Sequence, residues 1–176
     1  MIKNNIKSKK GFTIIEVVLV LAIAGLIFLM VFIAFPALQR GQKDTQRRDD
    51  MARFASQLAQ YQSNNYGKVP TTVAMWNNEF IANYLRSNGD TFADPSGENY
   101  IVADDYGICD KSANQKDDNN NVLCKQLSVD TDTAEGKIHV YTNASCSGET
   151  PYYKKGDKYI AFTYKLEGAG IYCGHN

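Results

Sequence analysis

This sequence of 176 residues has only two histidines and lacks the motifs that mark most enzymes and metal sites. His139 and His175 stand apart from any serine or cysteine nucleophile pattern, and neither a phosphate-binding glycine loop nor a paired-carboxylate motif is present. No two cysteines have the C-x-x-C spacing that is typical of zinc sites. We therefore expect no enzyme and no cofactor, with His139 on a strand face and His175 at a frayed terminus.

Cysteine is absent from the first 108 residues, which excludes a lipoprotein with a modified cysteine near its N-terminus. The chain also has no formal net charge, since 19 basic residues balance 19 acidic ones. The balance is uneven along the chain, because from Gln62 onward 10 basic residues face 15 acidic ones, a net charge of −5. An acidic domain is a poor match for a phosphate backbone, so nucleic acid is not expected as its main partner.

The sequence does contain one long apolar run with almost no ionisable residue. From Phe12 to Leu38 there are 27 residues, and Glu16 is the only charged side chain among them. A helix of that length rises about 40 Å, which exceeds the roughly 30 Å hydrocarbon core of a bilayer. The run is therefore predicted to be a helix that spans a membrane.

Glu16 needs a positive partner, because a lone carboxylate in a spanning helix costs on the order of a few kcal/mol. No Lys or Arg lies between Phe12 and Gln39. Cleavage of the chain before Phe12 would create a partner, since the new amine would lie one helical turn from the carboxylate. The pair would form within one chain or between neighbouring helices offset along their axes. In the second case the charge sets the register of a helical bundle.

The residues around Glu16 resemble the class III signal region of type IV pilins and pseudopilins. The match consists of Lys9-Lys10-Gly11-Phe12-Thr13-Ile14-Ile15-Glu16, followed by the apolar helix with Ala22 and Gly25. The resemblance implies that a prepilin peptidase cuts after Gly11, that the new N-terminal Phe12 is methylated, and that Glu16 is the assembly carboxylate. Many family members carry a helix-breaking proline where this chain has Ile33. Here the proline is Pro36, so any local unwinding in a filament is expected three residues later.

Three other interpretations of the apolar run compete with this one. A secretory signal would be cut at Ala22-Ile23-Ala24, but the run continues fourteen residues past Ala24, and Glu16 would interrupt its apolar region. A plain signal anchor leaves Glu16 without a role, and a buried helix of a soluble domain would be shorter. Charge counting does not decide the orientation. All four cysteines follow the run, as expected for an oxidising exterior on that side, and together with the leader resemblance they favour a cytoplasmic N-terminus.

Residues 39–61 are predicted to continue the helix out of the membrane. Helical spacing joins five residues into one apolar stripe that should lie against a globular domain: Met51, Phe54, Ala55, Leu58 and Tyr61. Three opposite-charge pairs have i,i+4 spacing: Arg40/Asp44, Asp44/Arg48 and Asp49/Arg53. Most of this charged run is predicted to be a solvated helix face. The helix is expected to end at residues 63–67, ahead of Pro70.

The remaining segments predict a small globular head. A short helix is expected from about Val73 to Leu85, with Trp76, Phe80, Tyr84 and Leu85 on its buried side, and Asp94-Pro95-Ser96-Gly97 is typical of a turn. Strands are predicted at residues 100–103, 138–142, 158–166 and 171–173, and residues 104–136 are expected to be surface loop. This order also resembles pilin-type heads. The predicted fold class is α+β, a long N-terminal helix followed by a head with a short helix and an antiparallel sheet of three or four strands.

Cys109, Cys124, Cys146 and Cys173 are predicted to form disulfides, for which three pairings are possible. Sequential pairing is favoured. A Cys109–Cys124 bond would close a loop rich in Asp and Asn. A Cys146–Cys173 bond would tie the C-terminal segment to the sheet, similar to the C-terminal disulfide region of many pilins.

The loop between the first two cysteines offers oxygen ligands for calcium. Asp117 and Asp118 are the weak candidates, with Asn119, Asn120, Asn121, Asp104, Asp105 and Asp110 nearby. Some pseudopilins bind calcium in a comparable loop. Because the EF-hand spacing and its glycine are absent, a solvated loop without metal is favoured.

Together these features predict a type IV pilin precursor with four parts: a basic leader at 1–11 that is removed, a filament-core helix at 12–38, its amphipathic continuation at 39–61, and an extracellular head at 62–176. The resemblance implies a single-pass precursor in the cytoplasmic membrane and then a filament on the cell surface. Its implied partners are other copies of itself, a prepilin peptidase, and an assembly ATPase with its membrane platform. Attachment, twitching motility and DNA uptake are the implied uses. A pseudopilin of a secretion machine, a minor pilin and a DNA-capturing competence pilin remain alternatives.

Overall fold

The computed structural model describes residues 11–103, 107–109, 116, 121–124, 136–168 and 170–176. The chain divides into two compact units, Met1–Gln39 and Arg40–Asn176. Each unit is described by itself, although the helix α1 (Ile14–Asn64) contributes residues to both. The leader residues 1–10 and the two calcium candidates, Asp117 and Asp118, lie outside the described residues.

In the first unit, α1 is apolar on every side and its large side chains are uncovered. Phe28, Phe32 and Leu38 are all more than half exposed. The helix continues through Pro36, although a proline cannot donate to the carbonyl one turn earlier. By length and composition this helix is able to cross a membrane. A helix that is apolar all round requires lipid or another protein around it.

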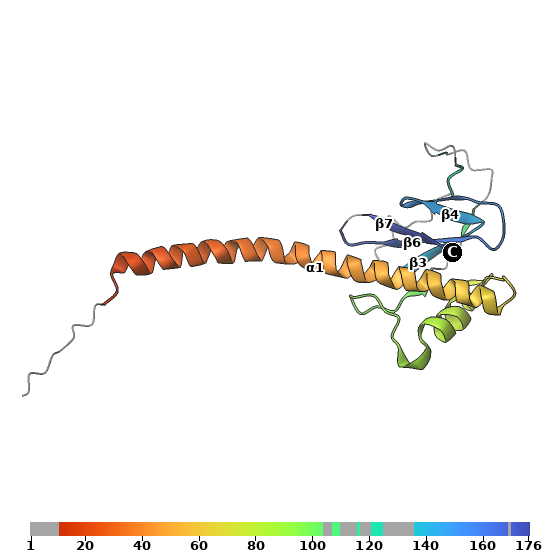
Figure 1. Ribbon diagram of the computed structural model, residues 1–176, viewed down its shortest axis with the longest axis horizontal. Coiled ribbons are helices and arrows are strands. Elements are labelled where there is room, and N and C mark those ends of the chain that lie inside the picture. Colours follow the sequence, from red (N-terminus) through yellow and green to blue (C-terminus); the bar gives the residue numbers. More distant parts are fainter. Residues whose placement is uncertain (1–10, 104–106, 110–115, 117–120, 125–135, 169) are drawn as a thin grey trace, which may run out of the picture. The chain divides into compact units, whose positions relative to one another are not determined.

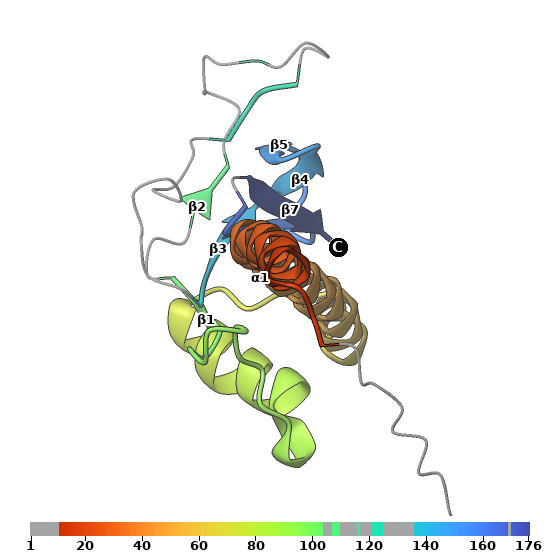
Figure 2. The same cartoon turned by 90° about the vertical axis from the view of Figure 1, so that its left-hand side faces the viewer.

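In the second unit, the same helix has one buried stripe. Met51, Phe54 and Leu58 are fully buried and Tyr61 is nearly so, which confirms the stripe predicted from the sequence. Phe54 lies at its centre, with its ring 4.8 Å from that of Phe162 and 5.2 Å from that of Phe80 (centroid to centroid). This part of α1 lies between the sheet on one side and the short helix η1 on the other (Figure 1, Figure 2).

The predicted short helix is η1, Met75–Leu85, and it is wound as a π-helix. Trp76, Phe80 and Leu85 are fully buried as predicted, and so is Ile81, which was not in the predicted set. Tyr84, the fourth predicted residue, is only partly buried. The wider turn of a π-helix explains this set, because residues four and five apart then share one face. The short helix η2, Ser87–Gly89, follows it. The predicted turn at residues 94–97 is confirmed by a hydrogen bond that Gly97 N donates to Asp94 O over 2.8 Å.

The sheet has the order β1-β3-β6-β7, with β2 also paired to β3. Its strands are β1 (Ile101–Val102), β2 (Gly107–Ile108), β3 (Lys137–Thr142), β6 (Ile160–Lys165) and β7 (Ile171–His175). The pairs β3–β6 and β6–β7 are antiparallel as predicted, but β1 and β2 lie parallel to β3. The prediction of a wholly antiparallel sheet was therefore wrong at this edge, and the α+β fold class is confirmed. β2 also shows that the segment predicted as loop contributes a strand.

Both faces of the sheet are covered. Ile160, Phe162 and Tyr164 of β6 belong to the core that contains the α1 stripe. Ala161 faces the other way, into a smaller cluster with Tyr141 and Ala144. A separate hairpin of β4 (Ala144–Ser147) and β5 (Thr150–Tyr153) lies on that far side (Figure 2). This second layer was not predicted, and it explains why β6 is buried at five consecutive residues.

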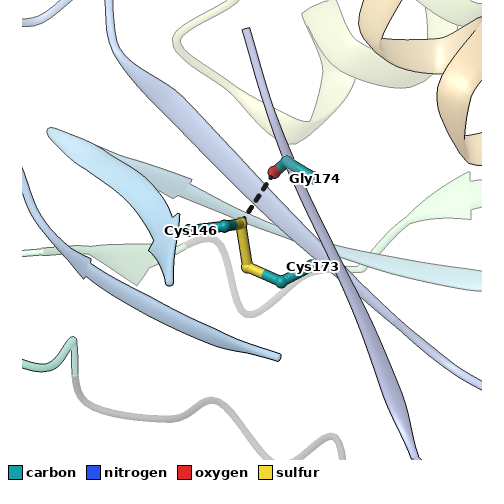
Figure 3. Close-up of a disulfide and its surroundings, with 3 residues drawn as sticks. All are labelled: Cys146, Cys173 and Gly174. Atoms are coloured by element: carbon teal, nitrogen blue, oxygen red, sulfur yellow. Dashed lines mark hydrogen bonds between the residues drawn. A yellow bond between two sulfur atoms is a disulfide. The ribbon is translucent and has the colours of Figure 1, made fainter. Parts of the chain in front are cut away.

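Two disulfides are present, Cys109–Cys124 and Cys146–Cys173, which is the sequential pairing favoured above. The first belongs to the small cluster on the far face of the sheet. The second joins β4 to β7 (Figure 3), where Cys146 Sγ also lies 3.2 Å from the carbonyl oxygen of Gly174. A disulfide sulfur carries no proton, so this is a close contact and not a hydrogen bond. The bond ties the last strand to the hairpin.

Gly174 is a position where only glycine fits. A Cβ built there would lie 2.4 Å from the Phe162 ring, which packs across the glycine in the facing strand. His175 follows in β7, so the expectation of a frayed terminus was wrong for this residue. His139 lies on the strand β3, as predicted, and it is buried.

A buried arginine is the exception to the prediction that most of the charged run of α1 is a solvated face. Arg47 is 2% exposed and pairs with Asp94 through two bonds, from Nε over 2.6 Å and from Nη2 over 2.8 Å. Asp94 also accepts hydrogen bonds from Ser96 N and from the Tyr164 hydroxyl. Burial acts to raise the pKa of Asp94, but the Arg47 guanidinium and these hydrogen bonds lower the pKa well below its usual range. The turn at residues 94–97 is thereby docked on α1.

Asp44 and Lys43 extend this contact to the β6–β7 turn. Asp44 accepts hydrogen bonds of 2.8 Å from the backbone N–H groups of Glu167 and Gly168. Lys43 pairs with the Glu167 carboxylate over 2.9 Å. Asp44 also pairs along α1, but with Arg47 at i,i+3 over 3.4 Å. None of the three predicted i,i+4 pairs is among the ion pairs of the described residues.

Candidate functional site

The N-terminus of α1 carries the candidate site, and Thr13 and Glu16 form a capping box there. The helix begins at Ile14, so Thr13 is the N-cap and Glu16 is the third helical residue. Glu16 Oε2 accepts hydrogen bonds from Thr13 N and from Thr13 Oγ1, each over 2.8 Å. In return, Glu16 N donates to Thr13 Oγ1 over 3.4 Å. The helix start is thus fixed by two residues that are one turn apart.

The capping box gives Glu16 a partner inside its own chain. Both Thr13 donors use the same carboxylate oxygen, Oε2, and in the described part of the chain no hydrogen bond reaches Oε1. Neutral donors satisfy a carboxylate only in part, because they do not balance its charge. The geometry leaves one oxygen available for a cation. The T-x-x-E pattern was visible in the sequence, and Thr13 is a residue that the sequence analysis did not single out.

The predicted cleavage position lies immediately before this cap. Gly11 and Phe12 belong to no helix or strand, and both are exposed, Phe12 by 89%. A Cβ built on Gly11 would meet no atom within 4 Å. The peptide bond between these residues is therefore accessible to an enzyme. An amine at Phe12 would be one residue from Thr13 and one helical turn from Glu16.

Apolar side chains surround the carboxylate. Phe12, Ile15, Val17, Leu19 and Val20 line the same surface of the helix as Glu16. All five are exposed, since among residues 11–39, the described part of the first unit, α1 is the one element present. Glu16 is thus the one charged side chain on the apolar helix of residues 12–38. If a second apolar helix covered this surface, a cation placed opposite the carboxylate would offset the cost of burying its charge.

The other predicted site residues do not join this one. The four cysteines form structural disulfides in the head. Among the described residues, no group of three or more His, Cys, Asp and Glu side chains is placed to hold a metal ion. The calcium candidates Asp117 and Asp118 belong to the residues outside that description.

Comparison with known proteins supports the N-terminal segment alone. A family described as "Prokaryotic N-terminal methylation motif" matches residues 6–32. This motif is the class III signal peptide of type IV pilin-like proteins. No curated protein matches the chain, and no solved structure matches it. The match covers residues 6–11 of the predicted leader, the Gly11–Phe12 bond, the capping box and part of the apolar run.

Proposed function

We propose that the chain is the precursor of a type IV pilus subunit that is cleaved after Gly11 and then polymerises through its α1 helix. The observation that carries this proposal is the single carboxylate of Glu16, with one oxygen free, on a helix whose apolar surface is uncovered. Cleavage supplies the missing cation as the amine of Phe12, which is then methylated. Methylation of an amine keeps its positive charge, so the modified end remains a partner for a carboxylate.

In the assembled filament, the free oxygen of Glu16 pairs with the Phe12 amine of a neighbouring copy. The apolar residues 12–38 exchange lipid contacts for contacts between helices, and the pair sets the axial offset. The heads form the outer wall. Partners of the precursor are the membrane, a prepilin peptidase, and an assembly ATPase with its platform. Surface attachment, twitching motility or DNA uptake is the use of such a filament, although the acidic charge of residues 62–176 disfavours DNA as a ligand of the head.

A pseudopilin of a secretion machine is the second candidate, because the methylation motif is also the feature that pseudopilins share with pilins. Abundance separates the two. A major pilus subunit dominates the mass of filaments sheared from cells, whereas a pseudopilin or a minor pilin does not.

Mass spectrometry of sheared surface filaments from the producing cells tests the proposal. We expect a chain that begins at a methylated Phe12 and contains two disulfides. In a Gly11→Ala variant we expect an unshifted precursor that retains its leader, because the peptidase requires the glycine. A filament protein that still begins at Met1, or a protein that stays as single copies in the membrane, would contradict the proposal.

A further inference from the structure

The strand β7 forms the outer edge of the sheet, on the side opposite to β1 (Figure 2). A hydrogen bond at each end of its pairing with β6 fixes the pattern: Leu166 N donates to Gly170 O over 3.0 Å, and Asn176 N donates to Ile160 O over 3.2 Å. Bonded and non-bonded residue pairs alternate along an antiparallel ladder. The even-numbered residues of β7 are therefore bonded to β6, and the backbone N–H and C=O groups of its odd-numbered residues point away from β6.

Three residues present these outward groups: Ile171, Cys173 and His175. In the described part of the chain, none of their backbone N–H donors and carbonyl acceptors has a hydrogen-bond partner. The Cys146–Cys173 disulfide holds the β4–β5 hairpin against the far face of β7, but the two hairpin strands bond to each other and not to this edge. Ile171 and Cys173 are partly exposed and His175 is exposed, so another strand can reach the edge.

Nothing in the sequence of β7 protects this open edge. Proteins usually block an exposed edge strand with lysine, proline or a bulge. The strand β7 has the sequence I-Y-C-G-H, and its pairing with β6 runs without interruption. Its glycine cannot be replaced by a residue that shields the edge, since a Cβ on Gly174 would collide with the Phe162 ring. Such an edge is a template for a further strand.

The edge is complementary to itself. When two copies of β7 lie antiparallel with their Cys173 residues opposite each other, Ile171 of each copy lies opposite His175 of the other. Each opposed pair then exchanges two hydrogen bonds, so the outward groups of both strands are all satisfied. No opposed pair brings like charges together, which would weaken the pairing. A contact of this kind uses the same surface on both copies and requires a twofold axis.

We propose that β7 is an interface through which the head pairs with the head of a second copy, edge strand against antiparallel edge strand. Pairing joins two five-stranded sheets into one continuous sheet. Two short strands bury far less than the roughly 800 Å² that each partner contributes to a standard interface. A single pair is therefore weak, and it gains strength where many copies lie in a row.

The consequence for a filament follows from symmetry. Neighbouring copies within one filament are related by a screw rotation and not by a twofold axis, so the β7 pair links heads of different filaments. This consequence rests on the proposed function. The pairing of two heads does not, because it requires only the edge of β7.

Proline at either end of the edge tests the interface. His175→Pro and Ile171→Pro each remove an outward N–H without breaking a bond to β6. Glycine precedes both positions, so the proline ring meets no neighbouring Cβ. The matched control His175→Ala changes the side chain but keeps the N–H. Ile171→Lys, which keeps every backbone group but adds a charge to each edge, replaces a proline variant that fails to fold.

The measurement is amide hydrogen exchange by NMR on the full chain in micelles, from micromolar to millimolar protein. In the wild type we expect the amides of residues 171, 173 and 175 to exchange about tenfold more slowly at the highest concentration, while those of residues 172 and 174 stay unchanged. Both proline variants should lose this slowing at Cys173, and His175→Ala should retain it. The α1 helix is the same in all variants, so its own association cannot produce the difference.

Three results would overturn the pairing. They are exchange that is independent of concentration in the wild type, equal slowing in the proline variants, and slowing that appears only when another protein from the producing cells is added. Electron micrographs of filaments test the consequence: wild-type and His175→Ala filaments should form bundles, and His175→Pro filaments should stay single. Wild-type filaments that stay single would contradict the link between filaments. A chain that forms no filaments would contradict the proposed function and leave the exchange result valid.

Discussion

The two halves of α1 meet the same physical requirement in opposite ways. Residues 40–64 bury one stripe against the core of their own chain, and even Arg47 finds a buried partner there. Residues 14–39 expose large apolar side chains on every side and carry one carboxylate without a cation. Burial of apolar surface is worth about 25 cal/mol per Å², so a helix that leaves this surface open depends on its surroundings. The first half therefore gains its stability outside the chain, and the second half gains it inside.

Glu16→Gln should have the largest effect on filament formation, and it tests whether residues 14–39 depend on the charge of Glu16. Glutamine keeps a hydrogen-bond acceptor for Thr13 but removes the charge that pairs with an amine. We expect processed subunits to accumulate in the membrane while filaments fall to background, measured by immunoblot of sheared and membrane fractions. Glu149→Gln, in the head, is the control and should assemble normally. Normal filaments from Glu16→Gln would show that charge does not set the register.

Phe54→Ala should cost the head about 3–5 kcal/mol of unfolding free energy, because a fully buried aromatic side chain leaves a cavity. Phe28→Ala is its counterpart in the first half, where the ring is 66% exposed. It should change the unfolding free energy of the head by less than about 0.5 kcal/mol, while weakening the filaments. Denaturant titration of the two variants in micelles measures the first quantity. Equal losses from both variants would mean that the two halves do not differ in this way.

Asp94→Asn should destabilise the head by about 3 kcal/mol, because it leaves the buried Arg47 guanidinium without its closest anion. Asp90→Asn removes the exposed partner of Arg53 and serves as the control. We expect it to cost no more than about 1 kcal/mol. Thermal unfolding at neutral pH compares the two variants, and a similar loss in both would show that burial of the Arg47 pair has no special weight.

The same pair predicts an acid-sensitive head. The pKa of Asp94 is lower in the folded chain than in the unfolded chain. Its stabilisation is therefore fully present well above the unfolded pKa of about 3.9, and it is lost as pH falls from about 5, through that value, toward the folded pKa. Burial raises the pKa of Asp50, which acts in the opposite sense. The difference between the wild-type and Asp94→Asn profiles isolates Asp94, and this difference should shrink on acidification.

Local patterns predicted much of the fold. The stripe from Met51 to Tyr61, three of the buried residues of η1 and the strand at β6 follow from spacing alone, whereas Ile81 does not because η1 is a π-helix. The candidate site at Glu16 was equally local, because a single charge in a long apolar run is visible without a structure. The contact of Thr13 with Glu16 was not predicted, although the T-x-x-E signature is present, because a neutral hydroxyl does not balance the carboxylate charge.

Partners that are distant in sequence could not be predicted. Arg47 and Asp94 are 47 residues apart in the sequence. The i,i+4 rule pairs the cations of α1 with acidic residues of the same helix, so it could not predict this pair. The parallel pairing of β1 and β2 with β3 depends on a connection that places them at one edge, and their two-residue length gives almost no signal. The β4–β5 hairpin on the far face was not predicted, because its segment contains Gly148 and Pro151. These two residue types indicate turns more strongly than strands.

Thr13→Val should have the smallest effect on filament yield, and it separates the role of the N-cap from the role of the Glu16 charge. Valine keeps the shape but removes the hydroxyl that donates to Glu16 Oε2 and accepts from Glu16 N. Loss of an N-cap costs about 1 kcal/mol, so we expect the Glu16 amide to exchange its hydrogen about fivefold faster in micelles. The control Thr13→Ser keeps the hydroxyl and should exchange at the wild-type rate. Filament yield should fall only in part, because the charge of Glu16 remains. If Thr13→Val lost filaments as completely as Glu16→Gln, the cap and the charge would act as one unit. The free oxygen would then lose its separate role, since an amine could pair with Glu16 only when Thr13 holds it in place.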